Sequence, residues 1–140
     1  MAVLETVVDS SVVVKWFLPE PFRPEAVRLL RAYQEQRIRL IAPSLLMSEV
    51  CNVFAKRLRR GEVSAASVHE AYRLLKINAP AAPDDAGLMD DALPLAMKGG
   101  QAVYDCLYLA LAIRRGCDMV TADQRFHAAM APMFPMLLRL

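Results

Sequence analysis

Four carboxylic acids stand at positions where a solvated charge is unusual. Asp9 directly follows a short apolar run, and Asp123 closely follows another. Glu49 and Asp105 each lie near the start of an apolar helical pattern. Taken singly, such residues are ordinary turn formers, helix caps or partners of the helix dipole. Taken together, they offer hard oxygen ligands with no adjacent His and no paired Cys, a set that favours Mg²⁺ or Mn²⁺ over zinc.

The four acids predict a particular chemistry if they share one cleft. Two unit charges 4 Å apart repel by ~4 kcal/mol at an effective dielectric constant of 20, so a cation is needed among them. A divalent ion with open positions lowers the pKa of a bound water and neutralises charge on a phosphoryl oxygen. The predicted reaction is therefore metal-dependent cleavage of phosphodiester bonds.

The elements that would bring these acids together are short strands separated by helices. This alternation requires crossover connections, and it predicts a parallel sheet with helices on both faces, a three-layer α/β/α sandwich. The carboxyl ends of parallel strands line the ligand crevice, which would direct Asp9 and Asp123 into one cleft. Tyr72 is expected on the buried face of its helix. The expected strands cover 6–8, 39–42, 118–121 and 136–138, and the last is expected to pair with the third. The expected helices cover 10–17, 24–36, 44–60, 64–75, 84–97 and 102–115, and Ser44 is expected to cap the third of them.

The composition is that of one globular domain, expected to cover residues 1–140. Apolar residues make up 56% of the chain and charged residues 23%, which excludes a disordered tail or a fibrous repeat. The net charge is only +2, but it becomes +6 when the four acids are set aside. We therefore expect a moderately basic surface around an acidic site, an arrangement suited to a nucleic-acid backbone.

Cysteine usage and hydropathy exclude two further classes. The three cysteines include no C-x-x-C spacing, so neither a disulfide framework nor a zinc knuckle is indicated. The longest uncharged stretch, 126–138, is too short to cross a membrane and contains two prolines. The first residues have no basic region ahead of an apolar one, which predicts a cytoplasmic protein.

Four sequence blocks resemble the PIN-domain ribonucleases of the VapC toxin type, from bacterial and archaeal toxin–antitoxin pairs. One such block would be weak support, but four in the right order at compatible separations are specific. The match covers nearly the whole chain. The blocks are 8–17 (VDSSVVVKWF), 43–52 (PSLLMSEVCN), 104–112 (YDCLYLALA) and 121–126 (TADQRF).

The resemblance implies a fold, a cofactor, partners and roles for individual residues. It implies a PIN-like sandwich that holds one or two divalent ions, Mg²⁺ or Mn²⁺, and cleaves RNA internally. It further implies a VapB-type antitoxin that covers the cleft, and a homodimer. By position, the metal-binding and catalytic residues would be Asp9, Glu49, Asp105 and Asp123, and the supporting residues Ser11, Asn52 and Thr121.

Three cations are candidate contacts for the RNA backbone. Arg57 belongs to the basic cluster 56–60, which would attract phosphates but also suits the negative end of a helix dipole. Lys15 lies six residues after Asp9 and could touch RNA or remain solvated. Arg125 follows Asp123 by two residues and is the stronger candidate.

Two other classes of function compete with the nuclease. A catalytically silent PIN-like binding module would keep the fold and use its cleft for a protein partner. It would cleave no RNA with Mg²⁺ or Mn²⁺ present. A phosphoacceptor domain on the same kind of sheet is disfavoured, because the phosphatase type needs an Asp two positions after Asp9 and this chain has Ser11 there.

Overall fold

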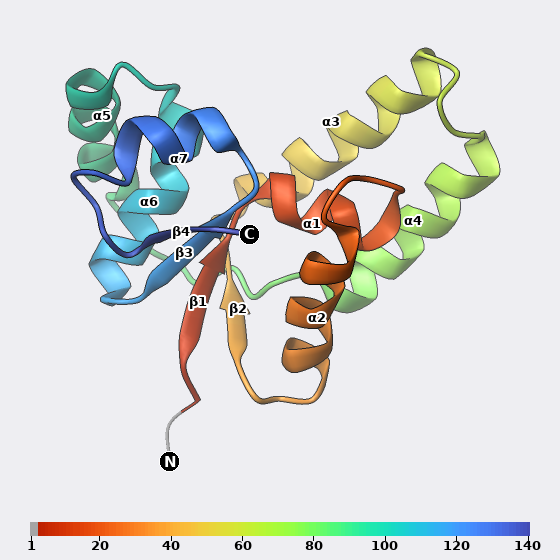
Figure 1. Ribbon diagram of the computed structural model, residues 1–140, viewed down its shortest axis with the longest axis horizontal. Coiled ribbons are helices and arrows are strands. Elements are labelled where there is room, and N and C mark those ends of the chain that lie inside the picture. Colours follow the sequence, from red (N-terminus) through yellow and green to blue (C-terminus); the bar gives the residue numbers. More distant parts are fainter. Residues whose placement is uncertain (1–2) are drawn as a thin grey trace.

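One parallel sheet forms the centre of the molecule. The computed structural model describes residues 3–140, so Met1 and Ala2 of the expected 1–140 domain lie outside the described residues. Within that range, four parallel strands follow the order β2-β1-β3-β4 (Figure 1). The expected strands and the pairing of the last with the third are confirmed. The strands are β1 (Glu5–Val8), β2 (Arg39–Ile41), β3 (Asp118–Thr121) and β4 (Leu137–Arg139).

Helices cover both faces of this sheet, which confirms the three-layer α/β/α class. α6 packs on β1 and β3 and carries α5 on its outer side, whereas α1 packs against β3, α2, α3 and α4. Figure 1 shows α5, α6 and α7 on one side of the sheet, α1 to α4 on the other, and α3 with α4 as a projecting hairpin. The helices within residues 3–140 are α1 (Ser10–Phe17), α2 (Arg23–Gln34), α3 (Leu45–Arg59), α4 (Ala65–Asn78), α5 (Leu88–Gly99), α6 (Val103–Arg115) and α7 (Gln124–Met130).

The helix α1 forms from a segment whose β-branched residues favour a strand. Asp9 caps it, because the Asp9 side chain accepts a hydrogen bond from the Ser11 backbone N–H. Its valines at 12–14 and Trp16 are all buried, and Trp16 Nε1 donates to the Ala26 carbonyl oxygen over 2.9 Å. Burial and capping therefore outweigh the local strand preference. The result is a sharp strand-to-helix turn with Asp9 at its corner.

The structure differs from the sequence-based prediction in four details. Tyr72 is not on the buried face of α4, since 41% of it is exposed while Ala71 and Leu75 are buried. The helix α5 begins at Leu88 rather than 84, directly after Gly87, whose backbone is left-handed with a φ of 79°. The helix α7 is not predicted from the sequence. Ser44 precedes α3 as expected, but its side chain makes no capping hydrogen bond within the described residues.

No helix between residues 3 and 140 has the length and apolar character needed to cross a membrane.

Candidate active site

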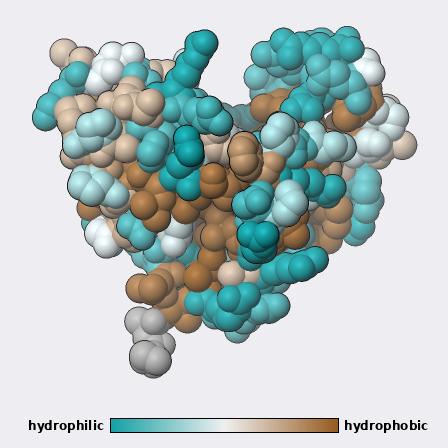
Figure 2. All heavy atoms as spheres, in the orientation of Figure 1, coloured by the Kyte–Doolittle hydropathy of each residue, from teal (hydrophilic) through white to brown (hydrophobic). Residues whose placement is uncertain are grey.

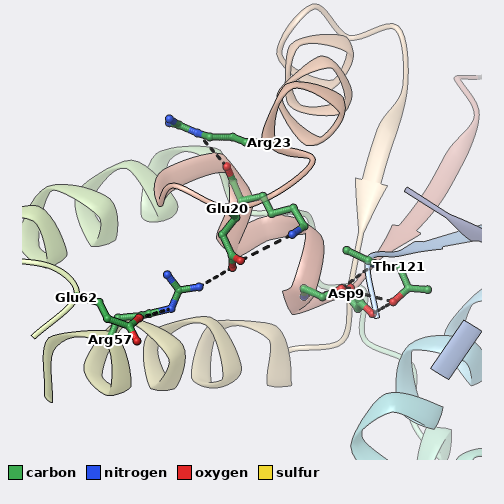
Figure 3. A network of polar contacts seen from close by, with 9 residues as sticks. Asp9, Glu20, Arg23, Arg57, Glu62 and Thr121 are labelled. Carbon is green, nitrogen blue, oxygen red and sulfur yellow. Dashed lines mark hydrogen bonds and ion pairs between the residues drawn. The ribbon is translucent and has the colours of Figure 1, made fainter. Parts of the chain in front are cut away.

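Asp9 is a buried carboxyl group held by two hydroxyl groups. It follows β1 directly and is only 6% exposed. Oδ1 accepts from the backbone N–H of Ser11 at 3.1 Å and from the Ser11 hydroxyl. Oδ2 accepts from the Thr121 hydroxyl at 2.5 Å (Figure 3). Both oxygens of Asp9 are therefore oriented by Ser11 and Thr121, the two hydroxyl residues expected to support the site.

Thr121 and Ser11 also fix the backbone that leads to the second aspartate. The Thr121 oxygen accepts from the Asp123 N–H at 3.1 Å, and the Ser11 oxygen accepts from the Ala122 N–H at 2.9 Å. Asp123 is exposed and caps α7, where its Oδ1 accepts from the Phe126 N–H at 3.0 Å. The ends of the neighbouring strands β1 and β3 are thus one hydrogen-bonded unit, as the strand-end prediction requires.

Glu49 and Asp105 reach the same region from helices. Glu49 lies in the second turn of α3 and Asp105 in the first turn of α6, and both are partly buried. The Tyr108 hydroxyl donates to Glu49 Oε1 over 2.5 Å. α6 lies on the sheet against β1 and β3, which brings its first turn toward the strand ends.

The charges of the four acids act on one another. Burial raises the pKa of Asp9 to about 6, against the lowering effect of its hydroxyl donors, and the charge of Asp105 adds to the rise. Burial also raises the pKa of Asp105 to about 6, and the charges of Glu49 and Asp123 raise it further. The charge of Asp105 therefore interacts with those of all three other acids, and their assignment to one metal site stays a prediction.

This donor set suits a divalent cation. Within residues 3–140, no group of three or more His, Cys, Asp or Glu side chains is already arranged to hold a metal ion. Like charges keep carboxylates apart, and a divalent cation reverses the sign of that interaction. Among the described residues, no Lys, Arg or His side chain forms an ion pair with Asp9, Glu49, Asp105 or Asp123. Hard oxygen ligands fit Mg²⁺ or Mn²⁺.

The surface of the molecule is hollowed on one side. Figure 2 shows a notch between the block formed by α5 to α7 and the α3–α4 hairpin. The carboxyl end of β1, which Asp9 follows, points toward this notch in Figure 1. The arrangement agrees with the rule that ligands of parallel sheets bind beyond the carboxyl ends of the strands.

Two of the three candidate RNA contacts belong to an ion-pair network. Lys15 is buried, and its Nζ lies 3.8 Å from Glu20 Oε2. Arg57 Nη2 lies 2.9 Å from Glu20 Oε1, and its Nε lies 3.1 Å from Glu62 Oε2 (Figure 3). The network ties the end of α1 to the end of α3. An RNA contact by Arg57 stays a prediction, and it would require Arg57 to leave two carboxylates.

Arg125 and Asn52 are placed differently. Arg125 is exposed on α7, two residues beyond Asp123, and makes no ion pair within the described range. Asn52 is exposed on α3, one turn beyond Glu49. Their expected roles stay predictions.

Sequence reasoning missed Tyr108. Its residue type suggested core packing, and its side chain is indeed fully buried. The available signal was its spacing, because a residue three positions after Asp105 lies on the same helix face. That spacing directs the hydroxyl of Tyr108 toward the acids.

Comparisons with known proteins identify the family. The model of the PIN domain matches residues 6–131. Ribonuclease VapC3 of Pyrobaculum aerophilum is 32% identical in an alignment 142 residues long, which covers 96% of this chain and 98% of that protein. The chain belongs to the PIN domain family, so the resemblance stated from the four blocks is confirmed.

Solved structures support the same fold. The crystal structure of PAE2754 from Pyrobaculum aerophilum superposes with a TM-score of 0.69 at 20% identity, over 91% of this chain and 87% of that one. A toxin–antitoxin complex from Klebsiella pneumoniae gives a TM-score of 0.64 at 13% identity, over 95% of each chain. At these identities the likeness concerns the fold, and it confirms the PIN-like sandwich.

Proposed function

We propose that this protein is a metal-dependent endoribonuclease that acts as the toxin of a toxin–antitoxin pair. The observation that carries the proposal is the buried carboxyl group of Asp9, which Ser11 and Thr121 hold at the ends of β1 and β3. None of the ion pairs of the described residues includes any of the four acids. The family and the ribonuclease of similar sequence supply the substrate class.

The proposed chemistry divides between a cofactor and the chain. Asp9, Glu49, Asp105 and Asp123 would hold one or two divalent ions, Mg²⁺ or Mn²⁺. When bound, such an ion activates water and neutralises the charge that develops on a phosphoryl oxygen. The chain contributes preorganisation, because its hydroxyl donors fix the carboxylates before any ligand arrives. Donors fixed in advance lower the cost of reorganising the site during the reaction.

RNA is the substrate that suits the charges around this site. Without the four acids the chain carries a net charge of +6, which attracts a phosphate backbone. Arg125 is the cation best placed to bind a phosphate near the acids. Lys15 and Arg57 would act mainly through the ion-pair network that braces α1 against α3, and any contact with RNA would be secondary.

The proposed partners are an antitoxin protein and a second copy of the chain. One structure of similar fold is a toxin–antitoxin complex, which supports an antitoxin of the VapB type here. The outer face of α5 exposes Met89, Leu93 and Met97 at helical spacing, and an exposed apolar face is typical of a protein interface. We place the complex in the cytoplasm, where its RNA substrate is found.

Expression in a bacterial host tests this function. Induction of the chain is expected to arrest growth and to produce cleaved RNA, because the acids are intact. The Asp105→Asn chain, expressed at the same level, is expected to do neither. Equal growth arrest by both chains would contradict the nuclease proposal and favour the silent binding module.

A further inference from the structure

Tyr108 donates a hydrogen bond to Glu49 from inside the protein core. Its side chain is fully buried, and its hydroxyl oxygen lies 2.5 Å from Glu49 Oε1. Tyr108 lies on α6 and Glu49 on α3, 59 positions apart in the sequence. The contact therefore joins two helices at the point where each carries an acid of the candidate site.

The Tyr108 hydroxyl acts as a donor in this contact. Burial and the hydrogen bond to Glu49 raise the pKa of the Tyr108 phenol well above its usual value. The negative charges of Glu49, Asp9 and Asp105 raise it further. A phenol that stays protonated has one O–H to donate, and Glu49 accepts it. These charges also place the hydroxyl within electrostatic reach of three of the four acids.

Glu49 needs such a donor more than a surface glutamate does. Its charge acts on Asp105, so the two carboxylates repel each other. A glutamate side chain also has several rotatable bonds, and repulsion would turn it away from the site. Among residues 3–140, Tyr108 is the hydrogen-bond partner of the Glu49 carboxylate. This attractive contact holds the carboxylate from the side of the protein core.

The contact parallels the arrangement around Asp9. Two hydroxyl groups, from Ser11 and Thr121, orient the Asp9 carboxylate. One hydroxyl group, from Tyr108, orients the carboxylate of Glu49. Residues that hydrogen-bond to metal ligands orient them and typically change metal affinity 10- to 100-fold when they are removed.

We propose that Tyr108 is a positioning residue for metal binding, whose hydroxyl fixes Oε1 of Glu49 and leaves Oε2 to bind the divalent cation. The inference rests on the proposed function, because it takes Glu49 as a metal ligand. A purely structural tyrosine would contribute its ring to the core and its hydrogen bond to stability alone. A positioning tyrosine additionally sets the affinity for the cation.

The Tyr108→Phe variant separates these roles, because it keeps the ring and removes only the hydroxyl. The matched control is Tyr33→Phe, which removes a 3.0 Å hydrogen bond from Tyr33 to the Ala79 carbonyl oxygen, between α2 and the end of α4. The probe is Mn²⁺ alone, with its dissociation constant measured by calorimetry on the full chain. Thermal unfolding in chelator measures the structural effect of each variant.

Tyr108→Phe is expected to weaken Mn²⁺ binding about 10-fold or more, and Tyr33→Phe to change it less than about 2-fold. In a Glu49→Ala background, adding Tyr108→Phe is expected to change Mn²⁺ affinity little, because the hydroxyl acts through Glu49. Unchanged Mn²⁺ affinity in Tyr108→Phe would overturn the proposal even if its thermal stability falls. The proposal would also be overturned if Tyr108→Phe and Tyr33→Phe weakened Mn²⁺ binding equally.

The outcome for Tyr108 is separable from the outcome for the nuclease. A wild-type chain that binds Mn²⁺ but cleaves no RNA would refute the proposed function, while the Mn²⁺ comparison would still decide the role of Tyr108. A wild-type chain that cleaves RNA while Tyr108→Phe binds Mn²⁺ normally would support the function and refute the positioning role. Failure of the wild-type chain to bind Mn²⁺ would refute both.

Discussion

The hydroxyl of Thr121 donates to Asp9 Oδ2 over 2.5 Å and accepts from the Asp123 backbone N–H over 3.1 Å. One buried side chain thereby joins the ends of β1 and β3 and orients an acid at each. Thr121 is fully buried, so its hydroxyl has no water to replace either contact. The geometry of the acidic site therefore depends on this single group more than on any exposed residue around it.

The Thr121→Val variant is expected to lower both stability and activity. Valine has nearly the same shape but leaves the Asp9 oxygen and the Asp123 N–H without a partner. The expected loss in unfolding free energy is about 1–3 kcal/mol, measured by urea denaturation. Thr121→Ser, which keeps the hydroxyl, is the control and is expected to retain more activity. Full activity in Thr121→Val would contradict the assigned role.

The Asp9→Asn variant is expected to separate activity from stability. Burial raises the pKa of Asp9 to about 6, so its charged form opposes folding at neutral pH in the absence of a cation. Removing the charge is expected to maintain or increase the unfolding free energy in chelator while reducing RNA cleavage about 100-fold or more. Urea denaturation and a cleavage assay on the same preparation measure the two quantities. A large loss of stability would contradict this account of Asp9.

The stability of the metal-free protein is expected to fall as the pH rises toward neutrality. The pKa values of Asp9 and Asp105 are about 6 in the folded protein, above their ordinary value of 3.8. The folded state therefore binds more protons than the unfolded state between these values, and the stability present at about pH 4 is lost as the pH passes about 6. Urea denaturation in chelator across this range measures the trend. The Asp9→Asn, Asp105→Asn double variant is the control and is expected to flatten it.

The arginines near the site are expected to differ in their effects. Arg125→Ala removes an exposed cation, so it is expected to raise KM for RNA. It is also expected to lower the slope of log RNA affinity against log salt concentration by about 1. Arg57→Ala breaks ion pairs with Glu20 and Glu62, so it is expected to cost about 1 kcal/mol of stability. Salt-dependent RNA binding and urea denaturation of both variants test the contrast. The reverse pattern would assign the phosphate contact to Arg57.

Much of the fold follows from local sequence patterns. The strands are short apolar runs that end at polar residues, and helix spacing is regular between them, so the parallel sandwich and the positions of Asp9 and Asp123 are predictable. The helix α1 is harder, since the valines at 12–14 favour a strand until Asp9 capping and core burial are known. Tertiary contacts decide such cases.

The site is predictable in its acids and less so in its supporting contacts. Asp9, Glu49, Asp105 and Asp123 are recognisable because charges in apolar segments are unusual. The Tyr108–Glu49 bond depends on how α6 packs near α3, which no local pattern specifies. The ion pair of the buried Lys15 with Glu20 likewise depends on the course of a loop that has three prolines nearby. Contacts between segments that are distant in the sequence could therefore be identified only from the structure.

The proposed nuclease activity requires both the four acids and a divalent cation. The most direct measurement is cleavage of a defined RNA by the purified chain with Mn²⁺, with excess chelator, and with Mn²⁺ after Asp105→Asn substitution. Internal cleavage is expected under the first condition alone, with the Asp105→Asn chain folded but inactive. Equal cleavage in chelator, or by the Asp105→Asn chain, would contradict it.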